Sequence, residues 1–203
     1  MDRKKRAFDL VVTVAGLTAC VPVTIAVGVA MRATGDPGPI FFGARRIGAG
    51  GHPFTLVKFR TMYVNSSGGM LTSDRDPRVT PLGRHLRRWK IDEIPQLWNV
   101  LRGEMSLVGP RPEDPRFVDL SDPTHRRVFT ATPGITGLAQ LKFRNEEALL
   151  TGSEPERVYR EEILPEKLRL DALYLDRRSL RLDARILLAT ALSVLRRSRP
   201  RQR

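Results

Sequence analysis

The sequence is poor in the residues that most often bind metals or form cross-links. Its 203 residues include one cysteine, Cys20, and three histidines that are scattered along the chain. A disulfide within the chain and a cysteine-based metal site are therefore excluded, and a zinc site built on histidines is not expected. A single cysteine suits a domain that faces a reducing compartment.

Acidic and aromatic residues are also scarce relative to basic ones. The chain has 35 Lys and Arg against 22 Asp and Glu, a net charge of +13, and only 6% aromatic residues. A chain this basic is expected to have anionic partners, such as nucleic acid, anionic lipid headgroups or phosphorylated substrates. We do not expect nucleic acid, because no known binding module is present and few aromatic side chains could stack on bases.

Charge is missing altogether from Leu10 to Met31. As a helix this stretch covers roughly 30 Å, the thickness of a bilayer's hydrocarbon core. A cleaved signal peptide is disfavoured, because the stretch is long and no convincing cleavage site follows. A straight membrane-spanning anchor is one alternative, and a re-entrant hairpin is the other.

Two features favour the re-entrant hairpin. Pro22, near the middle of the stretch, removes a helical hydrogen bond and is expected to break the helix. Basic residues flank both ends, at Arg3–Arg6 and at Arg32. Positive charge tends to stay cytoplasmic, so both flanks are satisfied only if the chain does not cross. We therefore predict a re-entrant helix-break-helix over residues 1–34.

Residues 35–203 are predicted to form one α+β domain that is predominantly helical. Two strand-like runs, Ile40–Ile47 and Phe54–Phe59, flank a glycine-rich turn and predict a small β-hairpin. A long surface loop is expected over residues 65–81, and turn-rich loops are expected over residues 106–112 and 133–137. Helices are expected over residues 82–89, 92–102, 159–176 and 180–197.

The last predicted helix, residues 180–197, is amphipathic, with arginines bordering its apolar side chains. This pattern fits a helix lying at a membrane interface, followed by the basic tail of residues 196–203. A soluble amphipathic helix packed on the core fits the pattern as well.

Three charged motifs point to phosphoryl chemistry. Asp92 and Glu93 are adjacent carboxylates, for which helix capping is the structural alternative. Arg111 lies between two prolines, a rigid way to present a guanidinium to phosphate oxygens. Lys58 and Arg60 are two residues apart on a predicted strand and share one face. A nucleophile or metal ligand together with cations that hold charge is what phosphoryl transfer requires.

In their order along the chain, these motifs closely resemble the bacterial sugar transferase family. More narrowly, they resemble the small monotopic phosphoglycosyl transferases, which start glycan assembly on undecaprenyl phosphate and lack the N-terminal transmembrane bundle of larger relatives. The motifs are Lys58-Phe59-Arg60-Thr61-Met62, Ile91-Asp92-Glu93-Ile94-Pro95-Gln96-Leu97, Met105-Ser106-Leu107-Val108-Gly109-Pro110-Arg111-Pro112 and Pro133-Gly134-Ile135-Thr136-Gly137-Leu138-Ala139-Gln140.

The resemblance implies a two-step reaction on the cytoplasmic face of the cytoplasmic membrane. Asp92 attacks a UDP-sugar, releases UMP and forms an aspartyl phosphosugar, which a polyprenyl phosphate then accepts. Asp92 and Glu93 form the catalytic dyad and are the implied ligands of Mg²⁺. The residues implied to bind phosphate or substrate are Lys58, Arg60, Arg88, Arg111 and Gln140. Anionic membrane lipids are implied partners, and a homodimer is left open.

Two positions depart from the family pattern. The family usually breaks its hairpin at Ser-Pro, whereas this chain has Val21-Pro22, with Thr18 or Thr24 as substitutes for the serine hydroxyl. After Gln140 many relatives continue with Asn-Gly-Arg, which residues 141–147 do not, so the sugar is left open. The alternative from another class is a non-catalytic basic protein of the membrane surface that binds anionic lipid or nucleic acid.

Overall fold

The computed structural model describes residues 2–35, 37–64, 66, 71–73, 76–150 and 154–196. The domain is predominantly helical, as predicted, and carries two small sheets. β1 (Phe41–Ile47) pairs antiparallel with β2 (Pro53–Phe59), with Phe41 opposite Phe59. This confirms the predicted hairpin. Its turn, η1 (Ala49–Gly51), contains Gly50 and Gly51 at φ 71° and 78°, a backbone region that favours glycine.

The second sheet lies in the two segments that were predicted to be loops. β3 (Ser106–Val108) pairs in parallel with β4 (Gly134–Thr136). Strands of three residues are too short to show an alternating pattern, which is why the sequence did not reveal them. Close packing requires glycine here, since a Cβ on Gly134 would lie 2.0 Å from the nitrogen of Gly109.

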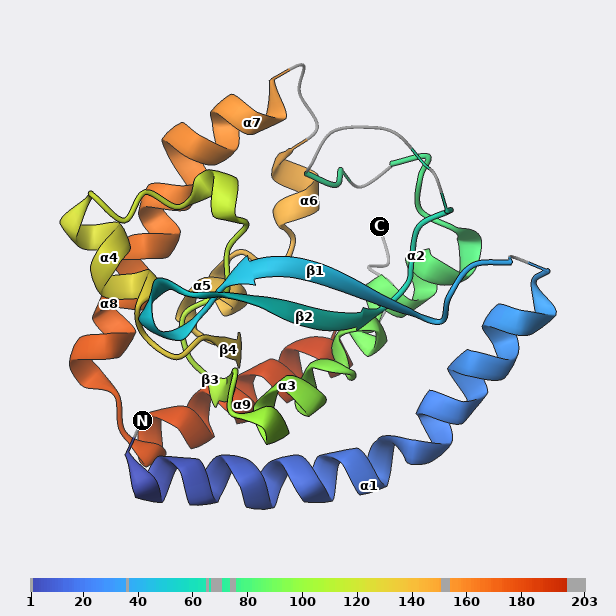
Figure 1. The fold of residues 1–203 in the computed structure, drawn as a ribbon, viewed down its shortest axis with the longest axis horizontal. Helices are drawn as coiled ribbons and strands as arrows, with labels where there is room; N and C mark the ends of the chain where they lie inside the picture. The colour runs from blue at the N-terminus through green and yellow to red at the C-terminus, as the bar shows by residue number, and fades with distance from the viewer. Residues whose placement is uncertain are drawn as a thin grey trace.

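The N-terminal segment forms one helix, so the predicted helix-break-helix is wrong in its break. α1 (Arg3–Ala33) continues through Pro22, and Figure 1 shows it running along one edge of the molecule and then bending. Proline lacks the N–H that would bond the carbonyl of Thr18, but one lost hydrogen bond bends a helix without ending it. The Thr18 hydroxyl donates to the Val14 carbonyl (3.0 Å), a bond that also favours bending.

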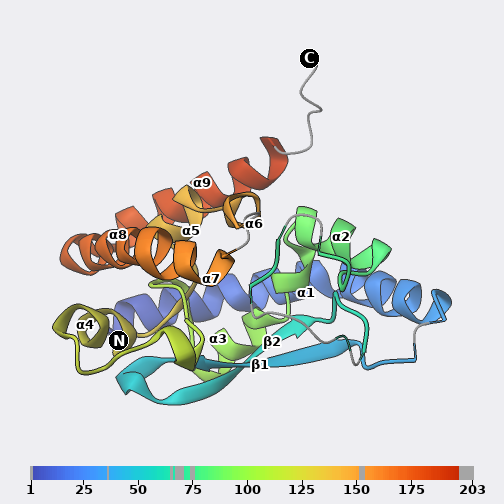
Figure 2. The same ribbon diagram turned by 90° about the horizontal axis from the view of Figure 1, so that it is seen from above.

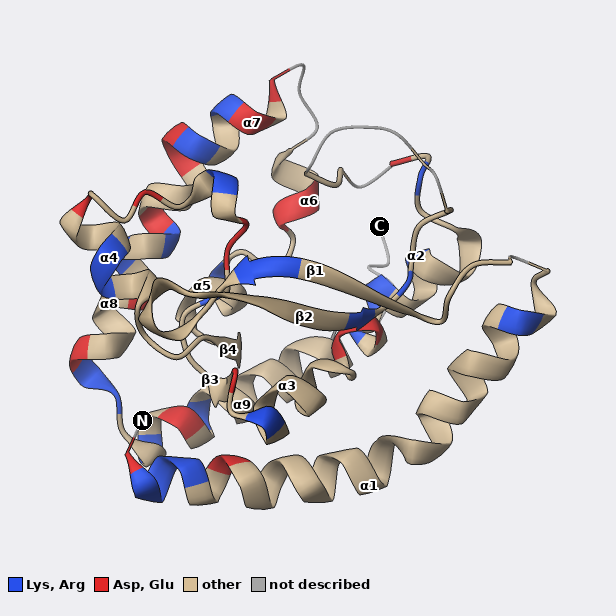
Figure 3. Ribbon diagram, viewed as in Figure 1, with Lys and Arg blue, Asp and Glu red and all other residues tan. Residues whose placement is uncertain are grey.

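By length and composition, the 31 residues of α1 are long and apolar enough to cross a membrane. Figure 3 shows that its charges lie only near its two ends. Several of its aliphatic side chains face outward, including Val11 (70% exposed), Ile25 (61%) and Val29 (64%). The helix therefore presents an apolar surface that the rest of the domain does not cover.

The helices around the dyad depart from the prediction at one boundary. α2 (Pro81–Arg88) lies where a helix was expected, and Thr80 caps it by accepting from Gly83 N. The expected helix from Asp92 to Arg102 is instead a 3-10 turn, η2 (Ile91–Glu93), followed by α3 (Gln96–Arg102). Pro95 is the N-cap of α3, and a proline at a helix start has no N–H to continue an earlier turn.

The last two helices, α8 and α9, pack on the side opposite the hairpin, as Figure 2 shows, whereas the helical turns within residues 115–129 contact the hairpin. The predicted helix over residues 159–176 begins with a π-helical turn, and the last predicted helix ends at Arg196. The elements are η3 (Pro115–Phe117), α4 (Pro123–Phe129), α5 (Leu138–Lys142), α6 (Glu146–Leu149), α7 (Pro155–Val158), η4 (Tyr159–Ile163), α8 (Leu164–Arg177) and α9 (Leu180–Arg196). The predicted basic tail lies almost entirely outside the described residues.

Two apolar clusters attach α1 to the domain on either side of its bend. Its first half packs with α3, β3 and α9 in a cluster that includes Val100 and Met105. Its second half contributes Val27 and Met31 to a cluster with Phe59 of β2. An ion pair between Lys5 and the buried Asp183 of α9 (2.6 Å) fixes the start of the helix. η2 and α3 therefore lie against the inside of the bend.

Candidate active site

Asp92 is buried on η2 and does not serve as a helix cap. Its exposed fraction is 6%, and neither η2 nor α3 has a side-chain hydrogen bond at its N-cap. Within the described part of the chain, Asp92 Oδ1 is buried with no hydrogen-bond partner. Burial, and then the charge of Glu93, raises the pKa of Asp92 above its usual range. An orphaned carboxylate oxygen is costly to bury, which favours a functional role over capping.

Glu93 lies beside Asp92 in a ring of positive charge. Its Oε1 lies 3.6 Å from Lys90 Nζ, 3.8 Å from Lys58 Nζ and 3.8 Å from Arg111 Nη2. Burial alone would raise the pKa of this carboxyl, but the three cations outweigh burial and lower the pKa to about 2. Glu93 is therefore ionised at neutral pH, and its charge holds the cations together.

The three cations of this ring come from different parts of the fold. Lys90 adopts a left-handed conformation (φ 57°), the only non-glycine residue in the described chain to do so. Lys58 is near the end of β2, where burial lowers the pKa of its ammonium to about 8 while Glu93 opposes that shift. Arg111 follows the β3 strand between two prolines, as the sequence analysis anticipated.

One buried side chain that sequence analysis missed fixes β2 against α3. Asn99 accepts from Val57 N (3.0 Å) and donates to the Thr55 carbonyl (2.7 Å) and to Glu104 (2.7 Å). It is 1% exposed, so these bonds form away from water. Because Lys58 directly follows Val57, Asn99 sets the distance between Lys58 and the dyad.

The five predicted substrate-binding residues all line one cavity with the dyad, but they differ in their contacts. Lys58 and Arg111 face Glu93, as described above. Arg60 donates instead to the carbonyls of Pro39 (2.6 Å) and Met62 (3.0 Å), so it joins the segment before β1 to the segment after β2. Arg88 is exposed at the cavity. Gln140 has an amide whose nitrogen and oxygen are both buried with no hydrogen-bond partner among the described residues.

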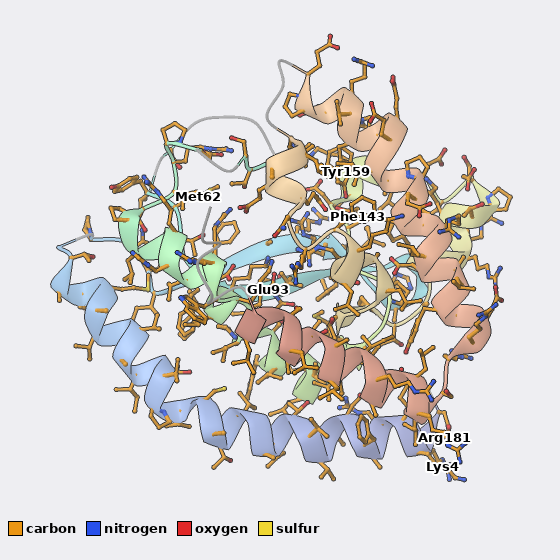
Figure 4. The ribbon with its side chains drawn as sticks, turned by 180° about the vertical axis from the view of Figure 1, so that it is seen from behind. Lys4, Met62, Glu93, Phe143, Tyr159 and Arg181 are labelled. Atoms are coloured by element: carbon orange, nitrogen blue, oxygen red, sulfur yellow. The ribbon has the colours of Figure 1, made fainter. Side chains whose placement is uncertain are left out.

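The cavity has a volume of about 1900 Å³ and reaches from β1 to the C-terminal half of α9. This exceeds the roughly 300–1,000 Å³ of a typical small-molecule pocket, so it has room for more than one substrate. Figure 4 shows Glu93 beside that half of α9, with Phe143 and Tyr159 farther along the domain. Arg87, which sequence analysis did not single out, lines the cavity and pairs with Glu147 of α6 (2.9 Å).

The residues present fit a magnesium ion that shares substrate oxygens. The described residues contain no group of three or more His, Cys, Asp or Glu side chains that could hold a metal ion by themselves. Mg²⁺ is, however, often bound by one or two carboxylates plus substrate phosphates. Asp92 Oδ1 is a carboxylate oxygen without a protein partner in the described chain, which is the kind of donor such an ion uses.

Asp171 of α8 accepts a hydrogen bond from the backbone of Arg111, and the pKa of its carboxyl can be tested by experiment. Its Oδ2 accepts from the backbone N of Arg111 (3.3 Å), and its side chain is 3% exposed. Burial raises the pKa of Asp171 to about 7, although the bond from Arg111 opposes the shift. A carboxyl whose pKa is higher in the folded state destabilises the fold progressively as pH rises from its unfolded value, about 4, to its folded one.

Asp171→Asn is therefore expected to stabilise the protein at alkaline pH. At pH 8 the variant should be more stable than the wild type by roughly 4 kcal/mol, since the pKa shift of about three units corresponds to about 1.4 kcal/mol per unit, and the gain should fall to about 1 kcal/mol at pH 4.5. Thermal unfolding of both proteins across this range measures the difference. Asp176→Asn, an exposed change on the same helix, is the control. A stability difference that does not vary with pH would contradict the raised pKa.

Comparison with known proteins decides the family. The family described as bacterial sugar transferase matches residues 1–197. The chain belongs to the bacterial sugar transferase family. Three relatives of this bacterial sugar transferase domain are identical to it at 39–40% of the aligned positions. They include an undecaprenyl-phosphate glucose phosphotransferase of Komagataeibacter xylinus, 39% identical over 92% of this chain.

Two further relatives carry related names. One is a UDP-glucose:undecaprenyl-phosphate glucose-1-phosphate transferase of Caulobacter vibrioides, 39% identical over 96% of this chain and 71% of that protein. The other is a UDP-N-acetylgalactosamine-undecaprenyl-phosphate N-acetylgalactosaminephosphotransferase of Aeromonas hydrophila, 40% identical over 68% of this chain. The chain spans 35% of the Komagataeibacter protein and 33% of the Aeromonas protein.

Proposed function

We propose that this chain transfers a sugar 1-phosphate from a UDP-sugar to a polyprenyl phosphate such as undecaprenyl phosphate. The observation that carries the proposal is Asp92, buried with an unpartnered oxygen next to an ionised, cation-ringed Glu93. The names of the relatives support the two substrates, since they specify UDP-sugars and undecaprenyl phosphate. This would be a membrane step that begins glycan assembly.

The proposed reaction has two displacements at phosphorus. In the first, a carboxylate oxygen of Asp92 attacks the β-phosphorus of the donor, and the bond from that phosphorus to the bridging oxygen breaks. Its electron pair leaves with UMP. In the second, an oxygen of the acceptor phosphate attacks the same phosphorus, and the bond to Asp92 breaks. The carboxylate is restored, and the product is a polyprenyl diphosphate sugar.

The surrounding charges fit defined roles in these steps. Arg111 and Lys58 would hold the oxygens of the transferred phosphate, where charge develops in the transition state. Glu93 is a poor proton acceptor with a pKa of about 2, so its role would be to fix those cations and to share a magnesium ion with Asp92. Mg²⁺, when bound, would neutralise diphosphate charge. Arg88 and Gln140 would contact other parts of the donor.

The outward apolar side chains support a membrane location. They occur on α1 and also on α9, where Leu188 (62%) and Leu195 (63%) are exposed. A soluble helix packed on the core would not need these residues outward, so an interfacial α9 is the better interpretation. We propose that the bent α1 enters and leaves one leaflet, with the catalytic domain on the cytoplasmic face. A non-catalytic lipid binder would leave the dyad and its cations without a role.

The experiment that tests the function is intact-protein mass spectrometry of the purified chain with Mg²⁺, a panel of UDP-sugars and no acceptor. We expect one sugar phosphate to be added to the protein, with the mass naming the sugar and one UMP released per adduct. EDTA should prevent the addition. Later addition of polyprenyl phosphate should restore the original mass. If no sugar in the panel adds to the protein and no UMP is released with both substrates present, the proposal is wrong.

A further inference from the structure

The active-site cavity has two chemically different parts. Near the dyad, Lys58 and Arg111 provide positive charge. One stretch of the lining is aliphatic, from Ile94, Leu97, Ile135, Leu141 and Val194, whereas the rest carries further charged side chains such as Arg84, Arg144 and Glu147. A nucleotide sugar is polar along its whole length and has no hydrocarbon chain to bury against such a lining. An amphiphile with a phosphate head and an aliphatic tail matches both parts.

The aliphatic lining is held in place from several elements. Leu97, Ile135 and Leu141 are half-buried against the cluster that contains Val100 and Met105. The hydroxyls of Thr136 and Thr190 lie 2.7 Å apart and join β4 to α9. This contact brings the next turn of α9, with Val194, to the cavity. The lining is thus a built surface, formed before any substrate arrives.

The same residues connect the cavity to the apolar surface of α1. A Cβ added to Gly16 would lie 3.6 Å from Leu97 Cδ1, so Leu97 lies between α1 and the cavity. Ile94 packs against the cluster that contains Val27, on the other side of the α1 bend. Next to the lining, Trp98 (55%) and Leu195 (63%) are exposed. Apolar surface therefore continues from the outside of the domain to the dyad.

We infer that this lining, which we name the acceptor groove, binds the first isoprene units of the polyprenyl phosphate. The inference rests on the proposed function and adds to it where the acceptor binds. The polyprenyl chain of the acceptor enters from the membrane between the α1 bend and the C-terminal half of α9. Its phosphate then lies toward Lys58 and Arg111. There a phosphate oxygen displaces Asp92 from the phosphosugar, and the electron pair of the broken bond returns to the carboxylate. The groove consists of Ile94, Leu97, Ile135, Leu141 and Val194.

Val194 offers the sharpest test, because it is half-buried near the end of α9 and its replacement should leave the core intact. Val194→Asn makes the groove polar, and Val194→Trp fills it. Leu188→Asn makes the same kind of change on an exposed position of α9, outside the cavity. Each protein is assayed in detergent for two half-reactions: formation of the sugar-phosphate adduct without acceptor, and discharge of the adduct to undecaprenyl phosphate or to a five-carbon isoprenyl phosphate.

We expect both Val194 variants to form the adduct at the wild-type rate but to discharge it to undecaprenyl phosphate about tenfold more slowly, a typical effect of altering one hydrophobic contact. Discharge to the five-carbon phosphate should change much less, and Leu188→Asn should match the wild type throughout. Three results in the Val194 variants would each overturn the inference that the groove binds the acceptor. They are slower adduct formation, an equal loss of discharge rate with both acceptors, and unchanged discharge to undecaprenyl phosphate. Failure of the wild type to form any adduct would count instead against the proposed function.

Discussion

Replacing Asp92 with Asn is expected to abolish the covalent adduct and to lower turnover by on the order of 10⁴-fold or more, the loss that follows removal of a catalytic nucleophile. A neutral amide oxygen is a much weaker nucleophile toward phosphorus than a carboxylate oxygen. The change should not unfold the protein. Burial raises the pKa of Asp92, so its ionised form destabilises the folded state at neutral pH, and a neutral side chain of the same shape removes that cost.

Glu93→Gln is the matched control, since it makes the same chemical change one residue away. The pKa of Glu93 is lowered to about 2, so its charge contributes stability that is present above its unfolded pKa and is lost as pH falls through the folded one. At neutral pH this variant should therefore melt at a lower temperature than the wild type, while still forming adduct slowly. Asp92→Asn should instead melt at a higher temperature than the wild type and form no adduct. A sugar phosphate mapped by peptide sequencing to any residue other than Asp92 would contradict the assignment.

Local chemistry made much of this site predictable from the sequence. Distinctive local patterns mark the adjacent carboxylates, the proline-flanked arginine and the lysine of the hairpin. In the structure, Lys58 Nζ and Arg111 Nη2 each lie 3.8 Å from Glu93 Oε1. The hairpin was predictable because its strands flank a glycine-rich turn.

What the sequence did not reveal depends on distant parts of the chain. Arg60 has the spacing of a phosphate ligand, but its guanidinium donates hydrogen bonds to backbone carbonyls of two loops. The conformation of those loops cannot be predicted from a local sequence pattern. Asn99 bonds to strand residues 42 and 44 positions away. The continuity of α1 through Pro22 has a similar origin, since packing on both sides of the bend compensates for one missing hydrogen bond.

The second large effect is expected at Arg111. Arg111→Ala should lower the rate of adduct formation by about 10²- to 10³-fold, the cost of removing one preorganised donor to a developing negative charge. Arg111→Lys should recover only part of this loss. Lysine keeps the charge, but it lacks the planar fork that contacts two phosphate oxygens, and its flexible stem would not be aligned by Pro110 and Pro112.

Single-turnover UMP release at saturating donor measures this effect separately from acceptor binding. Arg169→Ala is the control, because Arg169 is an exposed cation on α8 that pairs with Glu166 and does not line the cavity. Glu93 keeps its contacts with Lys58 and Lys90 in both Arg111 variants, so its carboxylate should remain ionised as in the wild type and the loss in Arg111→Ala should reflect the missing guanidinium. Full activity in Arg111→Lys would mean that charge suffices here. Full activity in Arg111→Ala would remove Arg111 from the phosphate site.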